Sequence, residues 1–233
     1  MFGRYSYDQI KVNEDLFIYG VGELSSIAYD YFQSDSPYNV CGYIADKEYN
    51  SLTSKSGLTI YDYDKFKDKY SENDVSVFVA VSAIKLNSER EKLIKKVQED
   101  GYVLANYVSS YSFIDSEVLI GSNCFVFENN VIQKGVSVGT GNIFWSGNHI
   151  GHQSKIGNFN FFSSHVVLSG YCHIGDNNFF GINSSIHDRV NIGNRNIIAA
   201  SANISKNCLD DTVYAGSPGR QVPGLLPKDV VFN

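Results

Sequence analysis

An apolar residue returns at every sixth position from Val108 to Ile204, through seventeen hexads without a break. A period of six matches neither the turn of an amphipathic helix nor the simple alternation of a strand. It matches a chain wound into coils with three short, flat sides, in which each hexad forms one side of a triangular column. Strands of an ordinary β-sandwich would lose this register at their turns. The pattern therefore predicts an all-β parallel β-helix in the C-terminal half.

A second period, of eighteen residues, supports three sides per coil. Glycine follows the apolar residue at one corner of each coil, at Gly121, Gly139, Gly157, Gly175 and Gly193. Glycine has no Cβ, so the backbone there can take a positive φ or approach its neighbour closely. Residues four places after the apolar one are mostly small or slender, which suits a narrow interior: Val118, Cys124, Val136, Ser154, Val166, Cys172, Ser184, Val190 and Ala202.

The first hundred residues follow a different pattern. Short apolar runs at 16–19, 40–44 and 75–81 alternate with segments of helical character. This alternation is typical of an α/β domain with a small Rossmann-like parallel sheet.

Three domains follow from these patterns. We predict the α/β domain over residues 1–106, the β-helix over 107–209 and a C-terminal cap over 210–233. The apolar ladder stops at Asp210 and Asp211, and the tail beyond them carries enough apolar residues to cover the open end of the column. Without a cap, the last strands would expose unpaired edges.

A glycine turn follows the first predicted strand. Gly20-Val21-Gly22 leads directly into a helix, and a helix N-terminus presents free backbone N–H groups that suit a phosphate. Only two glycines of the dinucleotide fingerprint are present, so an NAD site is not expected. A tight turn packed for structural reasons is the alternative.

Other polar residues are expected at the same edge of the sheet. Asp46 follows the second strand, where α/β sheets bind ligands, although aspartate is also common in ordinary turns. Lys85, Asn87 and Arg90 follow a later strand, where the solvated start of a helix explains them equally well.

Charge and composition exclude several functions. The formal net charge is −6, and no cluster of Lys and Arg could follow a nucleic-acid backbone or an anionic membrane. No signal-peptide pattern and no run of about eighteen apolar residues occurs, so a soluble, cytoplasmic protein is expected. The four cysteines lack metal-ligand spacing and are expected to be reduced packing residues: Cys41, Cys124, Cys172 and Cys208.

The histidines are the natural candidates for chemistry on the outside of a filled column. His149 and His152 lie in one short run, and His152 should point outward beside Gln153, which could orient it. A neutral imidazole there could take a proton from an amine or a hydroxyl group. A surface histidine without a ligand is the alternative. Because flat faces make shallow sites, a deep site would require a second subunit.

Zinc held between subunits is a rival use of the histidines, as in the gamma-type carbonic anhydrases. Such a site needs about three ligands and an open position. The histidines here lack that family's spacing, and no glutamate accompanies them nearby. We therefore expect no metal.

Three motifs, in order, resemble one family. They are Tyr19-Gly20-Val21-Gly22 in the front domain, GHQSKIG at 151–157 and GSPGR at 216–220. Together with the hexads, they resemble the left-handed β-helix sugar acetyltransferases of the sialic acid O-acetyltransferase and UDP-amino-sugar N-acetyltransferase group. The resemblance covers essentially the whole chain. It implies a homotrimer with active sites between neighbouring columns, acetyl-CoA as co-substrate, and direct transfer without an acyl-enzyme.

The resemblance also assigns residues of the transfer site. His152 matches the general base, and Gln153 stands in place of the carboxylate that usually follows it. Phe161 stands where relatives often place a second histidine that contacts acetyl-CoA, and His165 is the candidate to replace that histidine. Groups that match the pantetheine and thioester contacts or the cations near the CoA phosphates are Gly181, Ala199, Ala200, Ser201, Lys206 and Arg220.

Substrate contacts are assigned in the same way. Gly20 and Gly22 match the turn at the phosphate of a nucleotide-linked sugar, and Asp46 matches the carboxylate that reaches its base or ribose. Residues 23–25 depart from the usual Gly-His-Gly continuation. Asn148 and His149, close to the base in sequence, are assigned to the acceptor sugar.

The leading hypothesis is an acetyl-CoA-dependent acetyltransferase that modifies an amino or hydroxyl group of a sugar. The favoured acceptor is a nucleotide-linked amino sugar destined for a surface glycan. O-acetylation of the sialic acid type is one alternative. A non-catalytic trimer that binds nucleotide sugars is another, because Gln153 and Phe161 depart from the family pattern. Such a scaffold would not bind acetyl-CoA.

Overall fold

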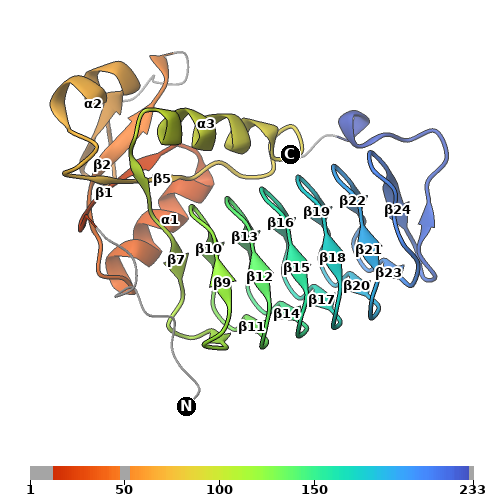
Figure 1. Cartoon of the computed structure of the whole chain (residues 1–233). Helices are drawn as coiled ribbons and strands as arrows, with labels where there is room; N and C mark the ends of the chain where they lie inside the picture. Colours follow the sequence, from red (N-terminus) through yellow and green to blue (C-terminus); the bar gives the residue numbers. More distant parts are fainter. Residues whose placement is uncertain (1–12, 48–52, 231–233) are drawn as a thin grey trace.

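The first domain is an α/β sheet domain, seen at one end of the molecule in Figure 1. The computed structural model describes residues 13–47 and 53–230. The strand order is β3-β4-β2-β1-β5-β6, and only the β3–β4 pair is antiparallel. Its elements are β1 (Asp15–Tyr19), α1 (Glu23–Ser34), β2 (Asn39–Ala45), β3 (Ser54–Lys55), β4 (Leu58–Asp62), α2 (Tyr63–Lys69), β5 (Ser76–Val79), α3 (Ser88–Glu99) and β6 (Val103–Leu104). The predicted parallel sheet is confirmed.

Alternate residues of the central strands pack on opposite sides of this sheet. Leu16 and Ile18 of β1 lie in one apolar cluster with α1, whereas Phe17 lies in another with Phe66 of α2 and Ile94 of α3. A strand covered on both faces needs an unbroken apolar sequence, which explains the run LFIY in β1.

The second domain is the predicted column, built from seventeen two-residue strands. Each strand ends on a ladder residue, and each pairs in parallel with the strand eighteen residues away, as between β13 and β16. The first face carries β7 (Tyr107–Val108), β10 (Phe125–Val126), β13 (Ile143–Phe144), β16 (Phe161–Phe162), β19 (Phe179–Phe180) and β22 (Ile197–Ile198). The second face carries β8 (Phe113–Ile114), β11 (Val131–Ile132), β14 (His149–Ile150), β17 (Val167–Leu168), β20 (Ser185–Ile186) and β23 (Asn203–Ile204). The third carries β9 (Leu119–Ile120), β12 (Ser137–Val138), β15 (Lys155–Ile156), β18 (His173–Ile174) and β21 (Asn191–Ile192).

Three lines of corners join these faces. We name the turns from the first to the second face the first corner, those from the second to the third face the second corner, and those from the third back to the first face the third corner. The apolar ladder fills the space between the faces as one continuous core. Ligands must therefore bind on the outside of the column.

Buried asparagines satisfy the backbone at the corners of the column. Asn142 Oδ1 accepts the N–H of Asn160, and Asn160 Oδ1 accepts that of Asn178, at 3.0 and 2.8 Å. These N–H groups lie inside the column, where leaving them without an acceptor would be costly. The hexad pattern predicts small interior residues, but it did not reveal this ladder of amides.

The regularly spaced glycines occupy the third corner, where successive coils touch. A Cβ on Gly157 would lie 2.8 Å from the carbonyl oxygen of Gly175 and 2.9 Å from its carbonyl carbon. None of the five regularly spaced glycines has a positive φ, so the close approach of the backbones explains them.

Replacing Gly157 by alanine is expected to lower the free energy of unfolding by about 1–3 kcal/mol, because the backbones of two coils would have to separate. Urea unfolding measures this loss. Gly22→Ser is the control, since nothing lies within 4 Å of a Cβ at Gly22 and serine is a favourable helix N-cap. Equal losses in the two variants would contradict the packing explanation.

The column continues into the segment predicted to be its cap. The backbone of Cys208 forms an isolated parallel β-bridge with Ile192, and β24 (Val213–Ala215) pairs in parallel with β22. Both pairings span sixteen residues instead of eighteen. The turn after Ile204 is therefore shorter, which breaks the sequence period but not the coil. β25 (Arg220–Gln221) then pairs antiparallel with β24 and covers part of its edge.

The C-terminal segment returns towards α3 after β25 (Figure 1). The short 3-10 helix η3 (Pro227–Asp229) lines a pocket together with Leu86 and Ser88 at the start of α3. The predicted cap at the open end of the column is therefore only part of the role of this segment. Val231, which was included in that prediction, lies outside the described residues.

The α/β domain covers the first face of the column. The outer residues of that face include Tyr107, Phe125 and Ile143, all fully buried in one cluster with α1 and β5. On the second face, by contrast, Phe113 and Val167 remain exposed. The column therefore presents one covered face and one face that exposes apolar side chains without a cover among the described residues.

Arg90 of α3 joins the two domains. Its side chain is fully buried, and burial lowers its pKa to about 9, so the guanidinium group remains charged at neutral pH. It donates hydrogen bonds of 2.9 to 3.3 Å to six acceptors: the carbonyl oxygens of Val81, Ser82, Gly141, Phe159 and Asn160, and Asn87 Oδ1. Asn87 is also fully buried and donates to the carbonyl of Asn178. The suggestion that both residues lie at a solvated helix start or a ligand edge is therefore wrong.

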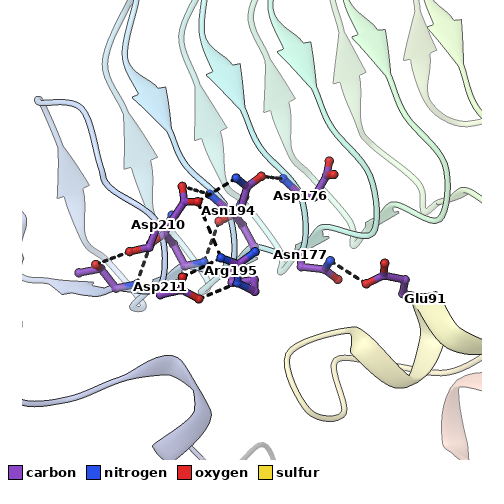
Figure 2. A network of polar contacts seen from close by, with 10 residues as sticks. Glu91, Asp176, Asn177, Asn194, Arg195, Asp210 and Asp211 are labelled. Atoms are coloured by element: carbon purple, nitrogen blue, oxygen red, sulfur yellow. Dashed lines mark hydrogen bonds and ion pairs between the residues drawn. The ribbon is translucent and has the colours of Figure 1, made fainter.

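A polar network continues this junction along the third corner (Figure 2). Asn177 Nδ2 donates to Glu91 of α3 at 2.8 Å. One coil further on, the guanidinium of Arg195 makes two hydrogen bonds to the Asp211 carboxylate, at 2.6 and 2.7 Å. The contact of α3 with the column therefore extends beyond the first coils.

Candidate functional site

His152 lies at the second corner, between β14 and β15. Its side chain is exposed, as predicted, and its imidazole ring rests on the next coil. A Cβ on Gly170 would lie 2.7 to 3.1 Å from atoms of this ring. The ring of Tyr171 meets the imidazole edge-on, with centroids 5.0 Å apart and planes at 88°. The missing side chain of Gly170 therefore leaves the space that the imidazole occupies, and the ring of Tyr171 packs against one edge of the imidazole.

Gln153 is turned away from this imidazole. Its φ is 58°, and its carboxamide occupies the space where a side chain on Gly135, in the preceding coil, would be. The side chain of Gln133 accepts the backbone N–H of His152 at 3.0 Å. Within residues 13–47 and 53–230, no hydrogen bond reaches the His152 ring. Geometry thus gives no support to the prediction that Gln153 orients the base.

The backbone N–H of Gly170 lies next to the imidazole. Gly170 is buried, and no acceptor for this N–H is found in the described part of the chain. Buried N–H groups normally have a partner, so an unpaired one beside a candidate base is a candidate donor to a ligand. Its position eighteen residues after His152 could have been found from the coil repeat.

The residues predicted to line the pantetheine lie at the first corner. Gly181, Ala199 and Ser201 donate their N–H groups to carbonyls of the column, at 2.7 to 2.8 Å. Ala200 is exposed, and its N–H has no partner among the described residues. A Cβ on Gly181 would lie 2.5 Å from this nitrogen, so the glycine keeps the space beside it open. Ala200 is the one of these four that can donate to a ligand.

The other predicted CoA contacts are more scattered. His165 is exposed at the first corner, Lys206 is exposed at the second corner beyond β23, and Arg220 is exposed in β25 at the far end. Phe161 is only 8% exposed and stacks on Phe179, at a centroid distance of 5.3 Å, within the cluster that joins the two domains. This burial gives Phe161 a structural role, which does not agree with the predicted contact to acetyl-CoA.

The two predicted acceptor contacts in the column lie in different places. His149 is at the outer position of β14 on the second face and is half-buried. Asn148 is 1% exposed and lies inside the column, where its amide bonds Trp145 and Val166. Asn148 is therefore a corner residue of the column, and the prediction that it contacts the acceptor is not compatible with its burial.

Two edges of the second face thus carry the two halves of the predicted site. His152 is at the second corner, and the free N–H of Ala200 is at the first corner. The full width of the second face separates these corners in one chain. The halves can meet only if a second copy of the column packs against this face.

The glycine turn of the α/β domain has the predicted form. Gly20 has a φ of 132°, and a Cβ there would lie 2.7 Å from the carbonyl oxygen of Ala80. Gly22 is the N-cap residue of α1 and has open space beside it. Lys55 Nζ donates to the carbonyls of Val21 and Gly22 at 2.7 and 2.8 Å, and burial lowers its pKa. This lysine places a cation at the turn, and no repeat or motif in the sequence pointed to it.

Asp46 lies at the end of β2, but its carboxylate already has partners. Tyr19 donates to Oδ1 at 2.7 Å, and Lys96 of α3 forms an ion pair with the same atom at 3.0 Å. Burial and then the hydrogen bond to Asp46 raise the pKa of Tyr19 above its ordinary value. The contact of Asp46 with a nucleotide stays a prediction.

The pocket beside η3 lies apart from these residues. Its volume is about 850 Å³, and its walls come from the start of α3, the third corner and the C-terminal segment. None of the residues predicted for the site lines it. In the described part of the chain, no group of three or more His, Cys, Asp or Glu could hold a metal ion, and no helix is long and apolar enough to cross a bilayer.

Comparisons with known proteins agree on the fold. No protein-family model matches the chain, and no curated protein matches it significantly. Solved structures do match, and those with TM-scores of 0.77 to 0.80 superimpose on 89–90% of this chain, which includes both the α/β domain and the parallel β-helix. The predicted fold class is therefore confirmed.

Three of these structures carry the comparison. The acetyltransferase domain of PglB from Neisseria gonorrhoeae FA1090, in complex with acetyl coenzyme A, has a TM-score of 0.80 and 19% identity over 90% of this chain and 100% of that chain. PerB from Caulobacter crescentus, in complex with CoA and GDP-perosamine, has a TM-score of 0.78 and 19% identity over 89% of this chain and 97% of that chain. WeeI from Acinetobacter baumannii AYE has a TM-score of 0.77 and 20% identity over 89% of this chain and 99% of that chain.

Proposed function

We propose that this protein is an acetyl-CoA-dependent acetyltransferase that acts on the amino group of a nucleotide-linked sugar. The single observation that carries the proposal is the exposed imidazole of His152, seated on Gly170 at a corner of a β-helix that follows an α/β domain. Structures with this architecture include one with acetyl coenzyme A and one with CoA and GDP-perosamine. The proposed setting is the cytoplasm, in the synthesis of a surface glycan.

The proposed assembly is a homotrimer. Phe113 and Val167 expose apolar side chains on the second face, and Ile182 exposes another at the adjoining first corner. Exposed apolar surface of this kind favours contact with another subunit. A head-to-tail contact closed by threefold rotation would set the second corner of one copy against the first corner of the next. His152 of one copy and Ala200 of its neighbour would then line the same groove, three coils apart along the columns.

The proposed reaction needs one base and one oxyanion donor. The amine nitrogen attacks the thioester carbonyl, and His152 takes the proton that the amine loses. The backbone N–H of Gly170, the glycine on which the imidazole rests, stabilises the oxygen that becomes negative. The carbon–sulfur bond then breaks, and CoA leaves as a thiolate that takes up a proton. An amide is left on the sugar.

The acceptor would bind with its diphosphate at the turn between β1 and α1. The N-terminus of α1 presents free N–H groups there, and the ammonium group of Lys55 lies beside them. Asp46 is proposed to contact the base or ribose, and His149 the sugar.

The test is incubation with acetyl-CoA and a panel of dTDP-, UDP- and GDP-linked amino sugars. Release of CoA thiol and an acceptor mass increased by one acetyl group are expected for at least one acceptor. Sugars with only hydroxyl groups, sialic acid included, serve as the comparison for O-acetylation. Absence of product with every amino sugar would contradict the proposal.

A non-catalytic nucleotide-sugar-binding trimer is the second candidate. It is favoured by the free imidazole ring of His152, since no hydrogen bond reaches that ring in the part of the chain that is described. Calorimetry separates the two candidates, because a scaffold would not bind acetyl-CoA.

A further inference from the structure

We propose that Tyr171 is the positioning residue for the His152 imidazole, in place of a carboxylate. This inference rests on the proposed function, because it assigns to the tyrosine a role in the same transfer site. The role is to hold the ring in one orientation, without accepting a proton from it.

The neighbouring glutamines do not hold the imidazole ring of His152 in one orientation. The carboxamide of Gln153 packs over Gly135 in the preceding coil, and Gln133 bonds the backbone of His152 rather than its ring. On the opposite side, the imidazole lies on Gly170, and Tyr171 meets it edge-on at 5.0 Å. Tyr171 is therefore the side chain whose contact with the ring can restrict its rotation.

Tyr171 itself is held in place by two features. Its φ is 57°, a left-handed conformation that is uncommon for a bulky residue, and its N–H donates to the carbonyl of His152 at 2.9 Å. The guanidinium group of Arg189, one coil further on, lies 4.4 Å from the centre of the tyrosine ring, and Asp188 pairs with that guanidinium at 3.1 Å. Stacking on a cation and edge-on contact between rings both restrict a side chain.

Tyr171→Asn removes the ring and keeps the backbone geometry. Asparagine tolerates the left-handed conformation, and Asn177 and Asn183 have a φ of 58° at other corners of this column. Loss of one edge-on contact is expected to lower kcat about tenfold, with the KM for acetyl-CoA unchanged. Tyr171→Phe keeps the ring and is expected to stay within about twofold of the wild type.

NMR of protein with ¹³C-labelled histidine tests the contact between Tyr171 and His152 in the same variants and needs no substrate. His152 is assigned from the signal missing in His152→Ala. The tyrosine ring current should displace this signal in the wild type and in Tyr171→Phe, and the displacement should disappear in Tyr171→Asn. If no acceptor is acetylated, the proposed function fails, and the NMR displacement alone decides whether Tyr171 holds the ring.

The expected result is a low kcat in Tyr171→Asn, rescue by Tyr171→Phe, and a displaced His152 signal whenever the ring is present. Any of three results would overturn the inference: full kcat in Tyr171→Asn, an equal loss in both variants, or a His152 signal that does not depend on the ring. A rise in the KM for acetyl-CoA with unchanged kcat would also overturn it, because it would assign Tyr171 to co-substrate binding.

Discussion

His152→Ala is expected to lower kcat by about 10²- to 10⁴-fold, the range for loss of a positioned general base. Acetyl-CoA binding should remain, since the proposed contacts to pantetheine come from the first corner of a neighbouring copy. Initial rates of thiol release on the best acceptor measure the first effect, and calorimetry with acetyl-CoA measures the second. A drop in kcat without loss of binding is the signature of a group that acts in the transition state.

His173→Ala is the matched control for that variant. His173 is also an exposed histidine on the column, at the outer position of β18 on the third face. Neither half of the proposed site includes it, so turnover should not change. Full turnover in His152→Ala, or an equal loss in His173→Ala, would remove His152 from the mechanism.

Arg90→Met is expected to lower the free energy of unfolding by about 3–5 kcal/mol, because each buried acceptor left without a donor costs about 1–3 kcal/mol and several would be lost together. Methionine fills part of the volume but removes a donor from five carbonyl oxygens and Asn87 Oδ1, of which the carbonyl of Asn160 keeps the N–H of Ile143. These acceptors come from α3, the loop after β5 and two coils of the column. The loss should therefore weaken the contact between the domains, and denaturant unfolding measures it.

Arg195→Met is the control for Arg90. Arg195 also lies at the third corner, but half of its side chain is exposed and its partner is the equally accessible Asp211. Exposed ion pairs contribute about 0–1 kcal/mol, so a small change is expected. If Arg90→Met were no less stable than Arg195→Met, Arg90 would not be the residue that joins the domains.

The repeat in the sequence determined most of the fold. The six-residue period places a ladder residue at the end of every two-residue strand, and the eighteen-residue period identifies the corner where glycines touch. The period fails only after Ile204, where the turn is two residues shorter and the column continues in β24. A search for a fixed period cannot follow the column across a shortened turn. The coil continues there because its strands still pair, although the number of residues between them has changed.

The site was less predictable, for reasons that differ between residues. Asn148 stands four places after a ladder residue, so the rule for interior positions already placed it inside. Phe161 is at an outer position, but the repeat does not say which face the α/β domain covers. The aromatic residues Tyr107, Phe125 and Phe179, at the same place in other coils of the first face, were the missed signal.

Two other residues show the limits of the sequence more clearly. Tyr171 could have been found by counting one coil from Gln153, but its contact with His152 depends on how the side chain turns. Lys55 reaches the glycine turn from the short strand β3, which pairs antiparallel with β4. A two-residue strand has no periodicity, so only the tertiary structure shows where its side chains lie.

Mixing two inactive variants tests most directly whether neighbouring copies complete one site. His152→Ala removes the base, and Ala200→Trp is designed to block the first corner. If each site combines these corners from adjacent subunits, trimers assembled from equal amounts of both variants should recover about a quarter of wild-type turnover, because random assembly pairs two intact halves in about one contact of four. Turnover no higher than the average of the separate variants would contradict the account.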